Sequence, residues 1–283
     1  MSKPWILVSP SSRGIGHALT RHLLRTTTLP ILATARSDLG QVKNSILDGF
    51  GSDQAANDAS ARLHLVKLDV TDESTIKAAR AKAETLFSPR EYHLHLGFAL
   101  PGILHPERST FQVEYDDALE TLKVNLLGPL MLMKWFSDFL PRKSVDLSHV
   151  AAGTQQGSGE GAPAALKIPE HAVWLSTSAR VGSTADNRLG GWYSYRASKS
   201  GVNSITRTFD LQLQTRSKAK AIAVAYHPGT VKTGLSKEFW GNVQDDRLFS
   251  PEFAAEKMVE VVMGSKVEDR GRCWDWKGQE ILP

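Results

Sequence analysis

The chain has 283 residues, of which 41% are hydrophobic and 23% charged, and its formal net charge is +4. These values are typical of a soluble globular protein, and the scattered Lys and Arg residues argue against a nucleic-acid partner. A single cysteine, Cys273, excludes an internal disulfide and a cysteine metal cluster and suits a reducing compartment. Because no apolar run has the length of a signal peptide or a membrane span, we expect a cytoplasmic protein with no membrane partner and no metal site.

Short apolar runs alternate with helix-like segments along the whole chain. The runs are typical of strands buried on both faces of a parallel sheet, and the segments between them have helical spacing. This alternation predicts one doubly wound α/β domain over residues 1–283, with ligands bound at the carboxyl ends of the strands. The predicted strands are 5–8, 31–35, 63–68, 94–99, 172–175 and 221–226, with a further strand near 272–276. The predicted helices include 17–25, 71–87, 116–140, 251–263 and one that carries Tyr195.

Two stretches depart from this alternation, one near 49–60 and one near 146–170. Both are rich in small and polar residues, which favour loops. Because the strand–helix alternation resumes after each, we expect surface-loop insertions and no domain boundary.

The turn after the first predicted strand joins it to a helix. The N–H groups and dipole at a helix N-terminus attract anions, and glycine lets the backbone approach a pyrophosphate closely. The turn therefore predicts a dinucleotide cradle, with a ligand-free glycine turn as the alternative. Its candidate binding residues are Ser9, Ser11, Ser12, Arg13, Gly14, Ile15 and Gly16.

Arg36 stands at the end of the second predicted strand, where such a fold selects its cofactor. An acidic residue here binds the ribose 2′-hydroxyl, whereas an arginine accommodates a 2′-phosphate. Arg13 lies in the neighbouring turn, and Asp38 comes two places late. The pair of arginines predicts NADP as the cofactor, and the alternative is two solvated side chains.

Tyr195 and Lys199 are four residues apart and so share one helix face. A neighbouring cation lowers the pKa of a tyrosine, which can then exchange a proton with an alcohol or carbonyl oxygen. Taken alone, this spacing more often marks two solvated side chains. Its meaning depends on the motifs around it.

The order of the motifs resembles that of the short-chain dehydrogenase/reductase family. Residues 178–183 and 186–195 further resemble a subgroup related to C-factor cell-signalling proteins. The resemblance implies a Rossmann-type fold, a homodimer or homotetramer, and an oxidoreductase that moves a hydride between NADP(H) and a small carbonyl or secondary alcohol. The matching motifs are the glycine turn, Asp69-Val70, Asn125, the serine segment, Tyr195-x-x-x-Lys199 and Pro228-Gly229-x-Val231-x-Thr233.

The resemblance also implies a role for each matching residue. Tyr195 would be the general acid/base, Lys199 would hold the nicotinamide ribose, and Asn125 would extend a water-linked proton path to Lys199. The alternative for Asn125 is a bond to the backbone group freed by Pro129. Tyr193 lacks a lysine partner and is expected to pack or to line the substrate pocket. Further cofactor contacts are implied for Asp69, Val70, Gly102, Pro228, Gly229, Val231 and Thr233.

Three departures from the family pattern stand out. Ser9-Pro10 replaces Thr-Gly, and Ala99-Leu100-Pro101-Gly102 replaces Asn-Asn-Ala-Gly. Ala179 occupies the place of the family serine, so Ser178 is the candidate hydroxyl for the reacting oxygen, with Ser183 as the other neighbour. These departures leave an alternative open, a catalytically weak dinucleotide-binding protein that signals or acts as a scaffold.

Overall fold

The central sheet has eight strands in the spatial order β10-β9-β6-β5-β4-β1-β2-β3. All neighbouring strands pair in parallel except β9 and β10, as the continuous apolar runs predict. This computed structural model describes residues 1–148, 150 and 166–283, so most of the insertion expected at 146–170 lies outside the described residues. The strands are β1 (Lys3–Ser9), β2 (Ile31–Ala35), β3 (Leu63–Lys67), β4 (Tyr92–Ala99), β5 (Ala172–Thr177), β6 (Ala221–His227), β9 (Cys273–Asp275) and β10 (Glu280–Ile281).

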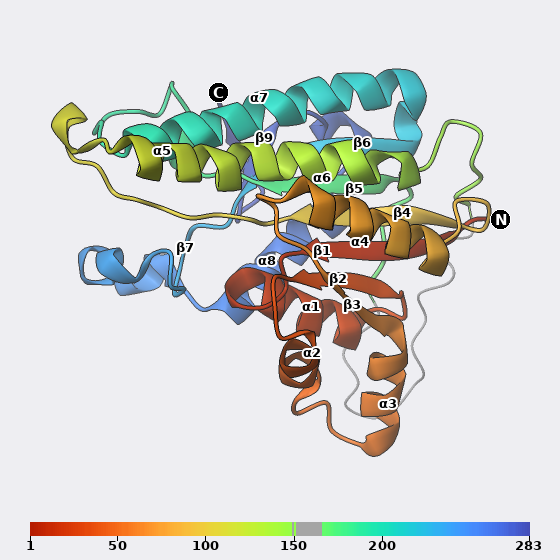
Figure 1. Ribbon diagram of the computed structural model, residues 1–283. Helices are drawn as coiled ribbons and strands as arrows, with labels where there is room; N and C mark the ends of the chain where they lie inside the picture. The colour runs from red at the N-terminus through yellow and green to blue at the C-terminus, as the bar shows by residue number, and fades with distance from the viewer. Residues whose placement is uncertain (149, 151–165) are drawn as a thin grey trace.

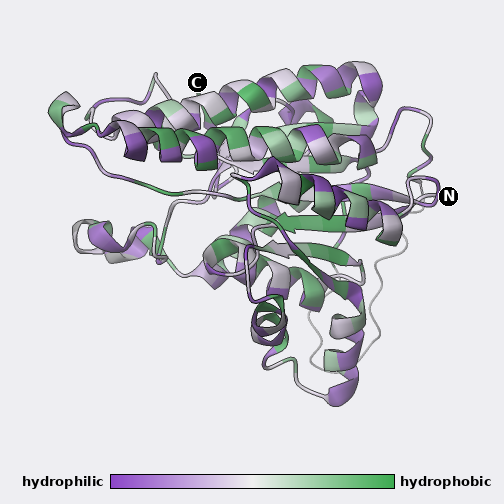
Figure 2. Ribbon diagram, in the orientation of Figure 1, coloured by the Kyte–Doolittle hydropathy of each residue, from purple (hydrophilic) through white to green (hydrophobic). Residues whose placement is uncertain are grey.

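Helices cover both faces of the sheet (Figure 1). One layer holds α1 (Gly14–Thr26), α2 (Leu39–Leu47), α3 (Asp53–Arg62) and α8 (Pro251–Met263). The other holds α4 (Glu73–Leu86), α5 (Tyr115–Leu122), α6 (Gly128–Phe136) and α7 (Tyr193–Arg216). Alternate residues of each strand enter opposite cores, so Ile6 packs in the α1–α8 core and Leu7 in the α4–α7 core. Figure 2 shows the resulting apolar centre and polar outer helix surfaces.

The helix expected at 116–140 is interrupted in the middle. A π-helical turn, Lys123–Leu127, separates α5 from α6, and Pro129 falls in the first turn of α6. Leu127 and Gly128 keep helical φ and ψ, so the chain stays helical through this turn, and the irregular hydrogen bonding there accommodates Pro129, which has no N–H. The irregular turn carries Asn125, which matters for the site below.

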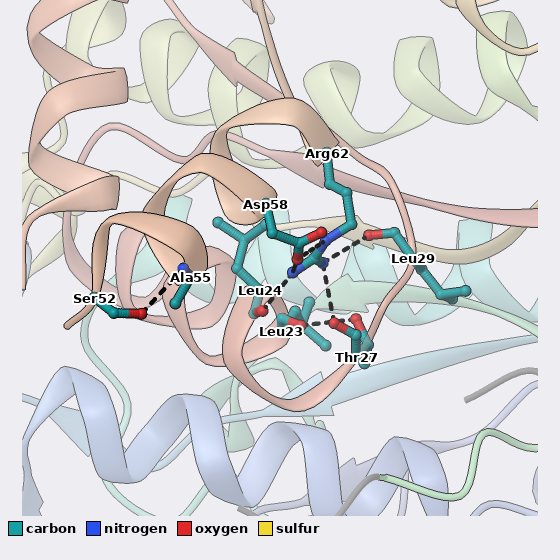
Figure 3. Close-up of polar contacts among 8 residues, drawn as sticks. All are labelled: Leu23, Leu24, Thr27, Leu29, Ser52, Ala55, Asp58 and Arg62. Carbon is teal, nitrogen blue, oxygen red and sulfur yellow. Dashed lines mark hydrogen bonds and ion pairs between the residues drawn. The ribbon is translucent and has the colours of Figure 1, made fainter. Parts of the chain in front are cut away.

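The loop expected near 49–60 was a wrong prediction, because residues 53–62 form α3. Ser52 caps this helix by accepting a hydrogen bond from the Ala55 N–H at 3.3 Å. Arg62 then ties the helix to the end of α1 and the following turn, as Figure 3 shows. Its guanidinium pairs with Asp58 and donates to carbonyl oxygens of α1 and of the turn after it: Leu24 at 2.9 Å, Thr27 at 3.0 Å and Leu29 at 3.3 Å. These long-range hydrogen bonds stabilise α3, whose small polar residues alone do not predict a helix.

The carboxyl ends of the parallel strands lie along one edge of the sheet, on the left in Figure 1. The glycine turn, Arg36, Asp69 and Ser178 follow β1, β2, β3 and β5, and the Pro228-Gly229 turn follows β6. A separate two-stranded ladder, β7 (Thr230–Val231) with β8 (Leu248–Phe249), extends beyond this edge. Within the described residues, no helix is long and apolar enough to cross a membrane.

Candidate active site

Tyr195 and Lys199 lie on one buried face of α7, in its first two turns. Tyr195 is 8% exposed and Lys199 is 2% exposed, so they are not a solvated surface pair. The Lys199 Nζ lies 5.7 Å from the centre of the Tyr195 ring and donates to the Thr177 carbonyl at 2.8 Å. Because Thr177 ends β5, this bond fixes the lysine at the carboxyl edge of the sheet.

The protonation of this pair differs from the sequence-based expectation. Burial raises the pKa of Tyr195 above its ordinary value and lowers the pKa of Lys199 to about 8. The expected lowering of the tyrosine pKa by Lys199 is therefore wrong for the protein alone. Removing the phenolate from water outweighs the attraction of an ammonium whose nearest partner is the Thr177 carbonyl. Tyr195 is held as a neutral phenol, the form that can donate a proton.

Asn125 is fully buried and links two distant segments. Its Oδ1 accepts from the Ile103 N–H at 2.8 Å, and its Nδ2 donates to the Ile103 carbonyl at 2.9 Å. The same Nδ2 donates to Ser198 Oγ on α7 at 3.1 Å. The side chain thus braces the segment after β4 against α7. The alternative in which it bonds the backbone freed by Pro129 is wrong, because its amide is used elsewhere.

Ser178 also supports α7. Its hydroxyl donates to the Lys199 carbonyl at 3.2 Å, and its N–H donates to the Tyr226 carbonyl at 2.8 Å. The hydrogen that the predicted role at the reacting oxygen requires is therefore donated to the helix instead. Ser183 Oγ accepts from the Asp186 N–H at 3.1 Å. The family position itself holds Ala179, which has no hydroxyl.

The glycine turn and the end of β2 form an open cavity of about 330 Å³. Ser12, Arg13 and Arg36 all line it, so the predicted arginine pair is brought together. Ser9 and Ser11 are instead fully buried and brace the turn from within. Ser9 Oγ accepts from Thr34 at 2.8 Å, and Ser11 Oγ donates to the Val8 carbonyl at 2.9 Å. Only part of the predicted turn is therefore available to a ligand through its side chains.

The start of α1 requires glycine at two places. Gly14 has φ +56°, a left-handed conformation that side chains disfavour. A Cβ at Gly16 would collide with the Pro10 carbonyl. The turn thus brings backbone close to the helix N-terminus, which is the arrangement that anion binding uses.

Asp69 and Val70 have partners within the protein. The Asp69 carboxylate accepts from the Thr71 N–H at 2.9 Å and the Thr71 hydroxyl at 2.7 Å, which closes the turn after β3. Val70 packs closely on Gly128: a Cβ added to Gly128 would lie 2.9 Å from the Val70 Cβ. Their predicted contact with the adenine stays a prediction.

Predicted residues from separate segments converge near Lys199. A Cβ placed on Gly102 would lie 3.8 Å from Lys199 Nζ and 3.4 Å from the Leu235 side chain. Likewise, a Cβ on Gly14 would lie 3.2 Å from the Thr233 methyl. The segment 230–235, which follows Pro228-Gly229, therefore spans from the glycine turn to the neighbourhood of Lys199. This continuity is what a dinucleotide that reaches from one to the other needs.

Aromatic side chains lie beside Tyr195. The Trp192 ring meets it edge to face at 6.1 Å between ring centres, and Phe239 lies 4.9 Å from Trp192. Tyr193 is 43% exposed and has no contact with Lys199 of the kind that Tyr195 makes. We conclude that Trp192 and Phe239 form an apolar wall next to the candidate acid/base.

Two residues near the site were missed by sequence reasoning. Glu107 is buried and accepts hydrogen bonds from Ser194 at the start of α7. His227 ends β6, has a buried Nδ1 without a partner among the described residues, and has its pKa lowered to about 4 by burial. Neither belongs to a spaced motif, and the partner of Glu107 is 87 residues away, so no local pattern could have identified them.

Comparisons with known proteins agree with this arrangement. No family model matches the chain. The C-signal protein of Myxococcus xanthus is 30% identical over 169 residues, which are 60% of this chain and 80% of that protein. The 1-hydroxy-2-glutathionyl-2-methyl-3-butene dehydrogenase of Rhodococcus sp. (strain AD45) is 27% identical over 267 residues, 94% of each chain. The NADPH-bound carbonyl reductase from chicken fatty liver shares the fold, with a TM-score of 0.76, 24% identity and 100% of both chains covered.

Proposed function

The chain belongs to the short-chain dehydrogenase/reductase family, and we propose that it is an NADP-dependent reductase of small carbonyl compounds. The observation that carries the proposal is the buried Tyr195–Lys199 pair, held at the same sheet edge as the glycine turn. The dehydrogenase activity named for the Rhodococcus relative supports the same reaction class. The reverse reaction, oxidation of a secondary alcohol, uses the same residues.

Arg13 and Arg36 would hold the 2′-phosphate of NADP. Both line one open cavity at the start of α1, and their guanidinium groups match a phosphate in charge and geometry. The N–H groups at the start of α1 would hold the pyrophosphate. When bound, reduced NADP supplies the hydride. Lys199, Gly102 and the segment 230–235 would border its nicotinamide half, since Gly102 lies next to both Lys199 and Leu235.

Tyr195 would donate its proton to the carbonyl oxygen of the substrate. Burial keeps the phenol neutral, so a proton is available, but the raised pKa makes it a weaker acid, and efficient transfer would need this pKa to fall when the cofactor is bound. Lys199, whose pKa burial lowers to about 8, would bind ribose hydroxyls once it exchanges its bond with Thr177. Asn125 would keep the segment after β4 against α7 and so hold this edge in shape. A water-linked path from Asn125 to Lys199 remains part of the proposal.

Purified protein with NADPH and a panel of aliphatic and aromatic aldehydes and ketones tests this function. We expect cofactor oxidation with at least one carbonyl compound, and a preference for NADPH over NADH. Tight NADPH binding without turnover across the whole panel would instead support a signalling or scaffold protein. Absence of both binding and turnover would contradict the two functions together.

We also propose that the protein is a homodimer or homotetramer in the cytoplasm. Leu127 and Leu211, on the π-turn and on α7, are about half exposed, as expected of helix faces that a second copy could cover. Light scattering at several concentrations measures the assembly. A monomer at all concentrations would overturn this part alone.

A further inference from the structure

The turn before α7 has an unusual backbone. Gly190, Gly191 and Trp192 have φ values of 64°, 66° and 51°, three left-handed residues in succession. Glycine adopts this conformation freely, but tryptophan does not. A left-handed tryptophan persists only where the surrounding structure holds it. What holds Trp192 therefore bears on the wall that its ring forms beside Tyr195.

One side chain and one main-chain carbonyl fasten this turn from opposite directions. From α7, the Arg196 guanidinium donates to the Gly191 carbonyl at 2.9 Å and the Gly190 carbonyl at 3.0 Å. From the segment after β4, the Glu107 carbonyl accepts the Trp192 N–H at 2.6 Å. The turn thus depends on a residue that is remote in the sequence.

The Glu107 side chain then binds the first turn of the catalytic helix. Its Oε2 accepts from the Ser194 N–H at 3.0 Å, and its Oε1 accepts from the Ser194 hydroxyl. The carboxylate is 3% exposed, and the ion pairs among the described residues include none that involves it. Burying an unpaired carboxylate is unfavourable, although the N-terminal dipole of α7 offsets part of the cost. The contacts that the carboxylate does make, two hydrogen bonds to Ser194, fix the start of α7.

We propose that Glu107 is a positioning residue for the reaction, its carboxylate acting through Ser194. The carboxylate holds the residue directly before Tyr195, while the main-chain carbonyl of Glu107 holds Trp192, whose ring lies beside Tyr195. The carboxylate touches neither reacting atom and works by fixing the direction of the phenol. The inference rests on the proposed reductase function.

Glu107→Ala and Glu107→Gln test this role. Glutamine keeps an oxygen acceptor for the Ser194 N–H and can donate to the Ser194 hydroxyl, whereas alanine keeps neither contact. We expect Glu107→Ala to lower kcat for the carbonyl by about a hundredfold, the loss that a displacement of about 1 Å produces. Glu107→Gln should recover kcat to within roughly threefold of wild type, because the acceptor at Ser194 returns. The affinity for NADPH should change little in either variant.

Glu114→Ala is the matched control. Glu114 lies in the same segment, precedes α5, and makes no side-chain cap bond. The Glu114→Ala variant should have the same kcat and KM as wild type. A lower melting temperature for Glu107→Ala with an unchanged kcat would overturn the proposal and make Glu107 a purely structural cap. Full loss in Glu107→Gln would also overturn it, since the hydrogen-bond geometry would then not be what matters.

Hydrogen exchange gives a second readout that does not require turnover. In Glu107→Ala the amide of Ser194 should exchange faster than in wild type, while those of β5 should not, and the amide of Trp192 should change less because its acceptor is the main-chain carbonyl of residue 107. Glu107→Gln should keep the Ser194 amide protected. If wild type reduces no carbonyl, the proposed function fails, and the exchange data still decide whether Glu107 holds the turn. Unchanged exchange in Glu107→Ala would contradict the positioning role.

Discussion

The two ends of the candidate site are built in different ways. At the nucleotide end, an open cavity is lined by Arg13 and Arg36, which come from neighbouring turns of one strand–helix–strand unit. At the reaction end, Tyr195 and Lys199 are buried and supported from far along the chain. Asn125 and Ser198 are 73 residues apart, and Glu107 and Ser194 are 87 apart. The nucleotide end exposes its charged side chains to solvent, whereas the reaction end buries its polar side chains.

This difference separates binding from chemistry. Solvated arginines act through attraction to an anion, so changes there should alter cofactor affinity and respond to salt. Buried groups act through desolvation and fixed direction, so changes there should alter turnover. Variants at the two ends should therefore fail in different measurements.

The largest effect is expected for Tyr195→Phe. Removing the phenol hydroxyl removes the proton donor and should lower kcat by about 10³-fold, within the range for general acid–base catalysis. NADPH affinity should remain close to wild type. Tyr193→Phe is the matched control, because Tyr193 is on the same helix turn but is 43% exposed. Equal losses in the two variants would show that the reaction end is not centred on Tyr195.

At the nucleotide end, Arg13→Ala with Arg36→Ala should weaken NADPH binding by about a hundredfold, the order expected for two lost charge-assisted hydrogen bonds. NADH binding should change much less, because NADH has no 2′-phosphate. Titrations of both cofactors measure the ratio, with Arg80→Ala as the control, since Arg80 pairs with Glu84 on α4. A parallel loss for NADPH and NADH would place the arginines elsewhere on the cofactor.

Acid should destabilise the buried end through His227. Burial lowers the pKa of His227 from 6.5 to about 4, so between these values the unfolded chain binds a proton that the folded chain does not. Its stabilising contribution is present above pH 6.5 and is lost as the pH falls toward 4, by about 2 kcal/mol at pH 5. Denaturant midpoints at pH 7 and pH 5 should show a smaller drop for His227→Asn than for wild type. An equal drop in wild type and His227→Asn would contradict this role of His227.

The smallest effect is expected for Ala179→Ser. This change supplies a hydroxyl at the position where the family has its serine, while Ser178 stays bonded to α7. A further donor to the reacting oxygen should raise kcat, by about tenfold, less than the loss seen when an evolved donor is removed. Single-turnover rates measure it. An unchanged rate would mean that the reaction end directs the oxygen away from residue 179.

These contrasts explain what the sequence could and could not predict. The glycine turn, Arg36 and the Tyr195–Lys199 spacing are local patterns, and the structure places them at one edge of the sheet. The helix α3 and the contacts of Ser178 depend on bonds to distant carbonyl groups, which no local pattern records. The direction of the Tyr195 pKa shift was also missed, because the spacing shows a neighbouring cation but does not show that the site is buried.

Transfer of deuterium tests the central claim most directly. The protein is given NADPH deuterated at the transferable position of the nicotinamide, together with a carbonyl compound that it consumes. The account predicts deuterium on the carbinol carbon of the product, made by wild type and Tyr193→Phe and about 10³-fold more slowly by Tyr195→Phe. Bound cofactor with no deuterated alcohol, from any carbonyl tried, would contradict it.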